Sequence, residues 1–208
     1  MQLSALAQQI VKDRYLHGDE SWEELIARVA KFVAQGPASQ TIDGAEEKFI
    51  SIMRQGKFLP NSPTLFNAGL FDTENQLSAC FVMHIPDSID GIFKTLYRAA
   101  HIFQSGGGVG YSLSQVRPKG DVVKTSGGKA SGPVSFLRVF DTMTDVIKQA
   151  GRRRGANMAT INIHHPDAVD FIRAKAEEGF FSNFNFSVLL TDEFLQASIK
   201  NDSYVTSF

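Results

Sequence analysis

Only one side chain in this sequence could do thiol redox chemistry, and that is Cys80, the single cysteine among 208 residues. It lies in a short apolar run, residues 79–85, after a proline-threonine segment at Pro63 and Thr64. Such a thiol could act on a phosphate-bearing substrate only with a partner sulfur, because two-electron thiol chemistry joins two sulfurs. The sequence offers no second one. A buried, structural role is the commoner one for a lone cysteine, since a reactive thiol needs access.

Two segments that contain glycine could approach an anion closely, because glycine tolerates backbone conformations that other residues avoid. Residues 106–110 read GGGVG, but Tyr111 stands where a dinucleotide-binding fingerprint needs its third glycine. Residues 128–130 lack both the upstream glycine and the Ser/Thr after lysine of a phosphate-binding loop. A simple helix-to-strand turn explains the glycines of residues 106–110 as well as an anion site does.

Three arginines, Arg152, Arg153 and Arg154, stand between Gly151 and Gly155. The guanidinium fork suits phosphate, and each charge-assisted contact contributes roughly 1.5–3 kcal/mol. A solvated basic turn after a helix is the alternative, because the helix dipole favours cations there. The residues leave both readings open.

Two adjacent histidines, His164 and His165, make a poor metal pair if they lie on a strand, because neighbouring side chains point to opposite faces. No HExxH, CxxC or spaced carboxylate–histidine set accompanies them. We therefore predict no metal site. We expect one of the two histidines to help cap the helix that follows.

Residues 1–75 are predicted to form an N-terminal helical region. Ser21 and Glu24 have the S-x-x-E spacing of a capping box, ahead of apolar residues that recur at helical intervals. Pro60 and Pro63 then predict an extended, turning segment.

Residues 76–208 are predicted to alternate strands with helices, which favours parallel pairing. Expected strands cover residues 79–85, 109–113, 158–163, 184–190 and 203–208, and Thr191 is expected to cap the helix between the last two. Pro166 suits the first turn of an earlier helix. Asp87 or Ser88 is expected to cap a helix with an inner face of Ile89, Ile92, Phe93, Leu96 and Phe103. Because the last predicted strand stops at Phe208, we expect the chain to be cut within a larger sheet or barrel.

The composition is that of a soluble globular protein, with 43% apolar and 21% charged residues. A net charge of −1 gives no reason to expect nucleic acid or membrane as a partner. No apolar run reaches membrane-spanning length, and no secretory signal opens the chain. A single cysteine excludes an intrachain disulfide and favours the cytoplasm.

Taken in order, five segments resemble the N-terminal part of the large catalytic chain of ribonucleotide reductase: FLPNSPTLFNAG, QLSACFV, IPDSIDGI, SGGGVGYSLSQVRPKG and KQAGRRRGANMATINIHHPD. Within that family, NSPTLFNAG and the Ala79–Cys80 pair are most similar to class II, which depends on adenosylcobalamin. The resemblance implies a helical region followed by the first strands and helices of a ten-stranded α/β barrel.

The resemblance also implies an activity, the reduction of ribonucleotides to deoxyribonucleotides for DNA synthesis. In the family a thiyl radical removes the ribose 3′ hydrogen, and a cysteine pair supplies two electrons as the 2′ hydroxyl leaves as water. Cys80 matches one cysteine of that pair, and an external dithiol such as thioredoxin is the implied reductant. The positions that match the substrate site are Ser62, Thr64, Ala79, Cys80 and Gly108.

A deoxynucleoside triphosphate effector is the second implied ligand, and it selects which base is reduced. Its site matches Asp87, Ser88, Ile89 and Arg117. The flexible loop that relays effector identity to the substrate matches Gly151, Arg152, Arg153, Arg154, Gly155 and Asn157.

The sequence departs from the family pattern at essential points, because the radical-bearing Asn-x-Cys-x-Glu loop and the second reducing cysteine are absent. We therefore expect this chain to need the C-terminal half of the reductase or a second chain, and a homodimer is a further implied partner. The alternative is a non-catalytic regulatory module that binds deoxynucleotides.

Overall fold

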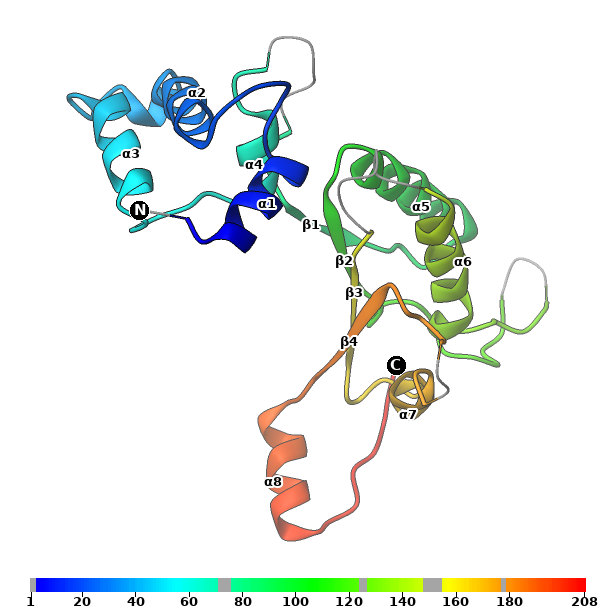
Figure 1. Ribbon diagram of the computed structural model, residues 1–208. Helices are drawn as coiled ribbons and strands as arrows, with labels where there is room; N and C mark the ends of the chain where they lie inside the picture. The colour runs from blue at the N-terminus through cyan, green and yellow to red at the C-terminus, as the bar shows by residue number, and fades with distance from the viewer. Residues whose placement is uncertain (1–2, 71–75, 124–126, 148–154, 177–178) are drawn as a thin grey trace. The chain divides into compact units, whose positions relative to one another are not determined.

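The computed structural model describes residues 3–70, 76–123, 127–147, 155–176 and 179–208 (Figure 1). The chain divides into two units, Met1–Ala79 and Cys80–Phe208. The sequence places the division between residues 75 and 76. Each unit is described by itself.

The first unit is helical, as predicted. Its elements are α1 (Ala5–Arg14), α2 (Trp22–Ala34), a short 3-10 helix (Pro37–Ser39), α3 (Ala45–Arg54) and α4 (Ser62–Asn67). The capping box forms: Ser21 Oγ accepts from the Glu24 N–H, and Glu24 Oε2 accepts from the Ser21 N–H at 2.7 Å. The apolar face of α2 packs with α3 and α4 in a core of Leu25, Ile26, Val29, Met53, Leu65 and Ala68.

The segment with the two prolines differs from the prediction, because it becomes helical at Ser62 instead of staying extended. Asn61 Oδ1 accepts from the Thr64 N–H at 3.0 Å and so caps α4. Pro63 lies in the first turn, where its missing N–H is not needed by the helix. The proline that was expected to exclude a helix instead helps to begin one.

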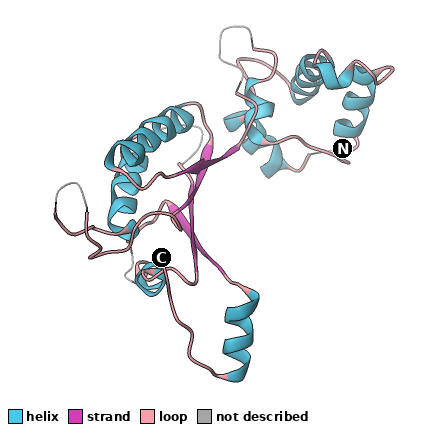
Figure 2. Cartoon of the chain, turned by 180° about the vertical axis from the view of Figure 1, so that it is seen from behind, coloured by secondary structure: helices cyan, strands magenta, loops and turns pink. Residues whose placement is uncertain are grey.

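The second unit contains a parallel sheet of four strands in the order β1-β2-β3-β4, which confirms the predicted pairing. The strands are β1 (Cys80–His84), β2 (Gly108–Ser112), β3 (Asn157–Asn162) and β4 (Phe184–Leu189). Helices α5 (Ile89–Gln104), α6 (Pro133–Val146) and α7 (Ala168–Arg173) lie along one face of the sheet, and α8 (Asp192–Lys200) follows β4 (Figures 1 and 2).

The core of the second unit lies between the sheet and those three helices. Its fully buried large side chains include Phe103, Tyr111, Leu137, Phe140, Ile161, Phe171 and Phe184. Because side chains alternate along a strand, the other face of the sheet carries residues that these helices do not cover. That face is where Cys80 lies, since the side chain of Cys80 is exposed and Phe81 is partly buried.

Ser88 caps α5 as predicted, but two residues of the predicted inner face are wrong. Ile89 is 64% exposed and Phe93 is 47% exposed. Thr95 and Ala99 are buried instead, together with the correctly predicted Ile92 and Phe103. A helix covers its core with a stripe about one-third of its circumference wide, and Ile89 and Phe93 fall on the neighbouring stripe.

Two further predictions near the end of the chain are wrong. Residues 203–208 join no strand, although the Ser207 N–H donates to His164 O at 2.7 Å. Pro166 precedes α7 instead of lying in its first turn. Thr191 caps α8 as predicted, because its Oγ1 accepts from the Phe194 N–H.

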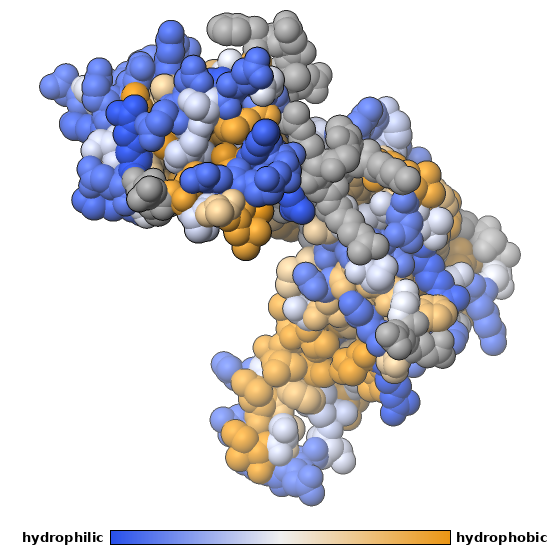
Figure 3. All heavy atoms as spheres, viewed as in Figure 1, coloured by the Kyte–Doolittle hydropathy of each residue, from blue (hydrophilic) through white to orange (hydrophobic). Residues whose placement is uncertain are grey.

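Apolar side chains gather on the surface over β4 and α8 (Figure 3), where Leu189, Leu190, Leu195 and Ile199 are exposed. Across the described residues, no helix combines the length and the apolar character that a membrane crossing requires.

Candidate functional site

Cys80 begins β1 with an exposed side chain, and its Cα is paired in register with Gly108 of β2. The alternative of a buried, structural cysteine is therefore wrong. Because successive side chains alternate, the thiol shares its face of the sheet with Val82 and His84, both exposed, and turns away from α5. A thiol in this position is open to reagents and to a substrate.

The glycines beside Cys80 divide into two kinds. A Cβ on Gly107 would lie 2.6 Å from Ile102 Cγ2 and 2.9 Å from Phe81 Cε2, so packing requires glycine there. A Cβ on Gly110 would meet nothing closer than 3.9 Å, so its packing does not require glycine. Gly110 pairs with Val82 in register and leaves open space on the face that carries the thiol. Packing thus explains Gly107, and a turn explains Gly106, whose φ is +91°, but neither explains Gly110.

The predicted substrate residues Ser62, Thr64 and Ala79 belong to the first unit, whereas Cys80 and Gly108 belong to the second. Ser62 Oγ lies 2.9 Å from the hydroxyl oxygen of Tyr15. Thr64 is buried, and its Oγ1 lies 2.9 Å from Asn61 Oδ1 and 3.1 Å from Leu77 O.

Thr64 is therefore tied to its own unit. Its hydroxyl joins the beginning of α4 to the chain that leads toward Cys80. Ala79, which is half-buried, directly precedes Cys80 in the sequence.

Two predicted effector residues, Asp87 and Arg117, are brought together. Arg117 Nε donates to Asp87 Oδ2 at 2.8 Å, and the Arg117 backbone N–H donates to Asp87 Oδ1 at 3.1 Å. Asp87 follows β1 and Arg117 follows β2, so both lie beyond the carboxyl ends of neighbouring strands. Ligands of open α/β sheets commonly bind at these ends.

The Asp87 and Arg117 side chains are partly exposed to solvent although they form an ion pair. The side chains are 31% and 29% exposed, respectively. Among the described residues, the two terminal nitrogens of Arg117 make no hydrogen bond, so its fork could still bind an anion. Ser88 Oγ accepts from the Gly91 N–H at 3.0 Å, and the neighbouring Ile89 is exposed.

The predicted relay loop is described only at its end. Gly151, Arg152, Arg153 and Arg154 lie outside the described residues, so both readings of the arginines stay predictions. Asn157 is buried, and its Nδ2 donates to Thr144 Oγ1 of α6 at 2.8 Å.

Gly155 also lies against Thr144, because a Cβ there would overlap Thr144 Cγ2. The Thr144 hydroxyl in turn donates to Phe140 O at 2.7 Å. The loop therefore ends on a fixed contact with α6. This contact was hard to predict from the sequence, because Thr144 is one polar residue within an apolar helix stripe.

His165 lies before α7, and its Nδ1 accepts from the Asp167 N–H at 3.0 Å. Since no side chain caps the first N–H groups of α7, the expected histidine cap does not form. The partner of His165, Asp167, was not singled out from the sequence. Among the described residues no group of three or more His, Cys, Asp or Glu side chains could hold a metal ion. The absence of a metal site stays a prediction.

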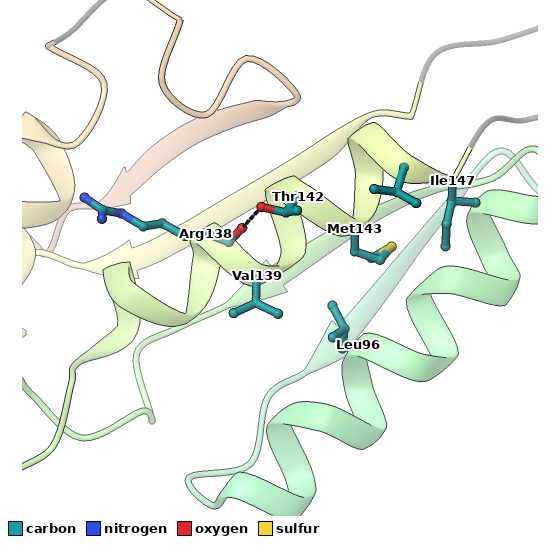
Figure 4. A pocket seen from close by; sticks show the side chains of 7 residues that line it. Leu96, Arg138, Val139, Thr142, Met143 and Ile147 are labelled. Atoms are coloured by element: carbon teal, nitrogen blue, oxygen red, sulfur yellow. Dashed lines mark hydrogen bonds between the residues drawn. The ribbon is translucent and has the colours of Figure 1, made fainter.

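A groove of about 540 Å³ lies between α5 and α6 (Figure 4). Among the described residues, its polar lining side chains are Arg138 and Thr142, and the Thr142 hydroxyl donates to Arg138 O at 2.9 Å. Such a surface suits apolar side chains better than a nucleotide. Its other lining residues are Leu96, Val139, Met143, Val146 and Ile147.

A helical unit followed by a parallel sheet with helices between its strands places this chain among the α/β proteins. The family model described as the ribonucleotide reductase barrel domain matches residues 78–208, and the model of its all-alpha domain matches residues 1–72. The chain therefore belongs to the ribonucleotide reductase family, which confirms the resemblance seen in the sequence.

Relatives named for vitamin B12 dependence share much of the sequence. The vitamin B12-dependent ribonucleoside-diphosphate reductase of Thermoplasma acidophilum is 53% identical over 159 residues, which are 76% of this chain and 20% of the relative. The protein of the same description from Mycobacterium tuberculosis is 44% identical over 211 residues, covering 97% of this chain and 30% of the relative. The chain thus spans less than a third of these relatives' length.

The same fold occurs in the Actinobacillus ureae class Id ribonucleotide reductase alpha subunit. The two superimpose with a TM-score of 0.78 at 25% identity, over 96% of this chain and 36% of the other. The predicted fold, helices followed by the first part of the α/β barrel, is confirmed. The similarity to the vitamin B12-dependent class is confirmed as well.

Proposed function

We propose that this chain supplies one reducing thiol and the effector site of a ribonucleotide reductase, which makes deoxyribonucleotides for DNA synthesis. The observation that carries the proposal is the exposed thiol of Cys80 on the sheet face that Gly110 leaves open. A ribose needs close approach to a reducing thiol, and glycine permits that approach.

In the proposed reaction Cys80 acts with a second cysteine that is not in this sequence. The two thiols give up two electrons and two protons, and a sulfur–sulfur bond forms between them. The bond between the ribose C2′ and its hydroxyl breaks, the oxygen leaves as water and a hydrogen takes its place. An external dithiol such as thioredoxin then reduces the disulfide by exchange.

The substrate would also contact Ser62, Thr64, Ala79 and Gly108. Because the Thr64 side chain is buried and bonded within its unit, we assign it the task of fixing the segment around Ser62. The half-buried Ser62 hydroxyl is the better candidate for a direct contact.

We propose that Asp87, Ser88, Ile89 and Arg117 bind a deoxynucleoside triphosphate effector. The terminal nitrogens of Arg117 would bind a phosphate while Asp87 holds Nε. Exposed Ile89 offers an apolar contact for the sugar or base. Residues 151–157 would relay effector identity, because an effector that binds two loop arrangements unequally shifts their populations.

Adenosylcobalamin is the proposed cofactor, since the first relatives are named vitamin B12-dependent. It would supply the radical chemistry when bound. We assign no residue of this chain to the cofactor, so the chemistry proposed for this chain is that of its own thiol. The proposed partners are the remaining part of the reductase, on the same or a second chain, and a second copy of the protein, in the cytoplasm and without nucleic acid or membrane.

The test of the thiol is Cys80→Ser in the full-length protein. Serine keeps the shape but cannot form a disulfide, so dithiol-dependent multiple turnover should be lost while effector binding, measured by calorimetry, is kept. Multiple turnover at the wild-type rate in this variant would refute the proposal for Cys80.

The alternative, a non-catalytic regulatory module, draws support from one contrast. The Asp87–Arg117 pair is complete within the described residues, whereas Cys80 has no partner sulfur in the sequence. Effector binding without turnover, in the presence of a dithiol and adenosylcobalamin, would favour the module. If calorimetry shows no heat with any of the four deoxynucleoside triphosphates at millimolar concentration, the chain binds no effector. Both the effector site of a reductase and the regulatory module would then be excluded.

A further inference from the structure

The side chain of Asp167 does not cap α7, although its position directly before the helix predicts that it should. Asp167 is the residue before the first turn of α7, where an aspartate side chain usually accepts from the helix's own N–H groups. Its carboxylate makes no such bond, and Oδ2 instead accepts from the Lys119 N–H at 2.8 Å. A local preference that is broken in favour of a distant contact often marks a functional position.

His165 bonds the same distant segment. The ring is 1% exposed, its Nδ1 accepts from the Asp167 N–H at 3.0 Å, and its Nε2 lies 2.9 Å from Val116 O. Since Nδ1 accepts and a carbonyl can only accept, the hydrogen belongs on Nε2, which donates to Val116. The imidazole is therefore neutral in this arrangement, and both ring nitrogens are used.

The two contacts lie on either side of Arg117. Val116 O is bonded by His165, the Arg117 N–H by Asp87, and the Lys119 N–H by Asp167. The residue between, Pro118, has no N–H to bond. The backbone that carries Arg117 is thus held at three points by side chains that follow the two strands flanking β2.

Gly132 adds a steric observation at the same place. A Cβ on it would lie 2.7 Å from Asp167 Oδ2 and 3.0 Å from the Lys119 nitrogen. Its φ of +79° is also one that other residues rarely adopt. Glycine therefore lets the chain pass directly over the Asp167–Lys119 hydrogen bond.

We propose that His165 and Asp167 are positioning residues of the effector site, which hold the backbone around Arg117 so that its guanidinium meets the effector phosphate already oriented. This inference rests on the proposed effector role of Arg117. A fixed backbone strengthens binding, because the ligand does not have to order the loop when it binds.

The experiment compares Asp167→Ala with Asp167→Asn in the full-length protein. Alanine removes the acceptor for the Lys119 N–H, whereas asparagine keeps an oxygen there. Calorimetry with each deoxynucleoside triphosphate should show binding weakened about tenfold by alanine, as expected for loss of one charge-assisted bond, and less than about threefold by asparagine.

The matched control is Phe171→Leu, which perturbs the packing of α7 on Phe186 but removes none of the hydrogen bonds that hold the Arg117 segment. It should lower thermal stability without weakening effector binding. Amide hydrogen exchange of Lys119 is a second readout, and it should become faster in Asp167→Ala and stay slow in Asp167→Asn and in Phe171→Leu.

The outcomes separate this inference from the proposed function. Suppose that effector binding is lost in Arg117→Gln but unchanged in Asp167→Ala, and that Lys119 exchange stays slow in Asp167→Ala. This result would overturn the positioning role and leave the proposed function standing. If wild-type protein binds no effector, the proposed function fails, while Lys119 exchange still reports whether Asp167 holds the segment. Should Asp167→Ala not fold, His165→Phe makes the same comparison by freeing Val116 O, and unchanged binding in that variant overturns the inference.

Discussion

Gly155 allows the contact between the predicted relay loop and α6 to be tested by a single methyl group. A Cβ on Gly155 would overlap Thr144 Cγ2, whereas the next nearest atoms, Thr144 Cβ and O, would both lie at 3.7 Å. The methyl of Thr144 is therefore the one serious obstacle. Its hydroxyl, which bonds Asn157 and Phe140, is on the other branch of the side chain.

The expected magnitudes follow from this geometry. Gly155→Ala should lower the free energy of unfolding by roughly 1–3 kcal/mol, because an added methyl in a packed site forces neighbours apart. Thr144→Ser removes the obstructing methyl and keeps the hydroxyl, so it should cost about 0.8 kcal/mol for one buried carbon.

The double variant should be more stable than the sum of the two changes predicts. The Cβ added at position 155 would occupy the space of the lost Thr144 methyl, and a backbone outside the left-handed region accepts alanine. Replacing glycine there also restricts the unfolded chain, which contributes about 0.4–1 kcal/mol. We therefore expect a favourable coupling of at least about 1 kcal/mol between the two positions.

The assay is urea unfolding of all four proteins, followed by far-ultraviolet circular dichroism. Strict additivity would show that Thr144 Cγ2 is not what excludes alanine from position 155, and the contact of the loop with α6 would have to be abandoned. Effector-dependent substrate choice, measured on the same proteins, should change in Gly155→Ala and return in the double variant.

Three further predictions concern single side chains. Iodoacetamide should label Cys80 in the native protein at close to the rate of a free thiol, because the side chain is exposed, and protection from labelling would contradict that exposure. Tyr111→Phe should be neutral or stabilising by up to about 1 kcal/mol, because no described residue bonds the buried hydroxyl. Burial also raises the pKa of Tyr111, so stability should begin to fall as the pH rises through the ordinary tyrosine value near 10 and should fall less in Tyr111→Phe; identical pH profiles would refute this. Arg28→Lys should lower the melting temperature, because Arg28 pairs with Glu20 and also donates to Ala68 O and Leu65 O, which one ammonium cannot reproduce; an unchanged melting temperature would refute it.

The sequence predicted those elements whose signals are local. The capping box at Ser21 and the cap at Thr191 were recognised because side chain and backbone partners lie three residues apart. The parallel sheet was predicted because its strands alternate with helical patterns.

The errors arose where distant contacts decide the structure. Ile89 and Phe93 look like core residues, yet they lie beside the buried stripe, and periodicity alone cannot choose between two adjacent stripes. Residues 203–208 have the composition of a strand, but in the described residues they do not join the sheet. Composition shows that a segment favours the strand conformation, whereas joining a sheet also requires a free sheet edge beside that segment.

The family resemblance predicts an effector role for Asp87 and Arg117, but it predicts none for His165 and Asp167. The sheet topology explains why these four residues lie near one another. Strand order in the sheet equals sequence order, so residues that follow β1, β2 and β3 are neighbours in space. Asp87 comes three residues after His84, and Arg117 and Asp167 each come five residues after Ser112 and Asn162, the last residues of their strands. Once the strands are assigned, charged residues at such short distances beyond parallel strands are expected to meet. In this sheet the cationic segment with Arg117 lies between the acidic residues Asp87 and Asp167. Both carboxylates accept from the backbone of that segment, so the Arg117 guanidinium keeps its terminal nitrogens for an anion.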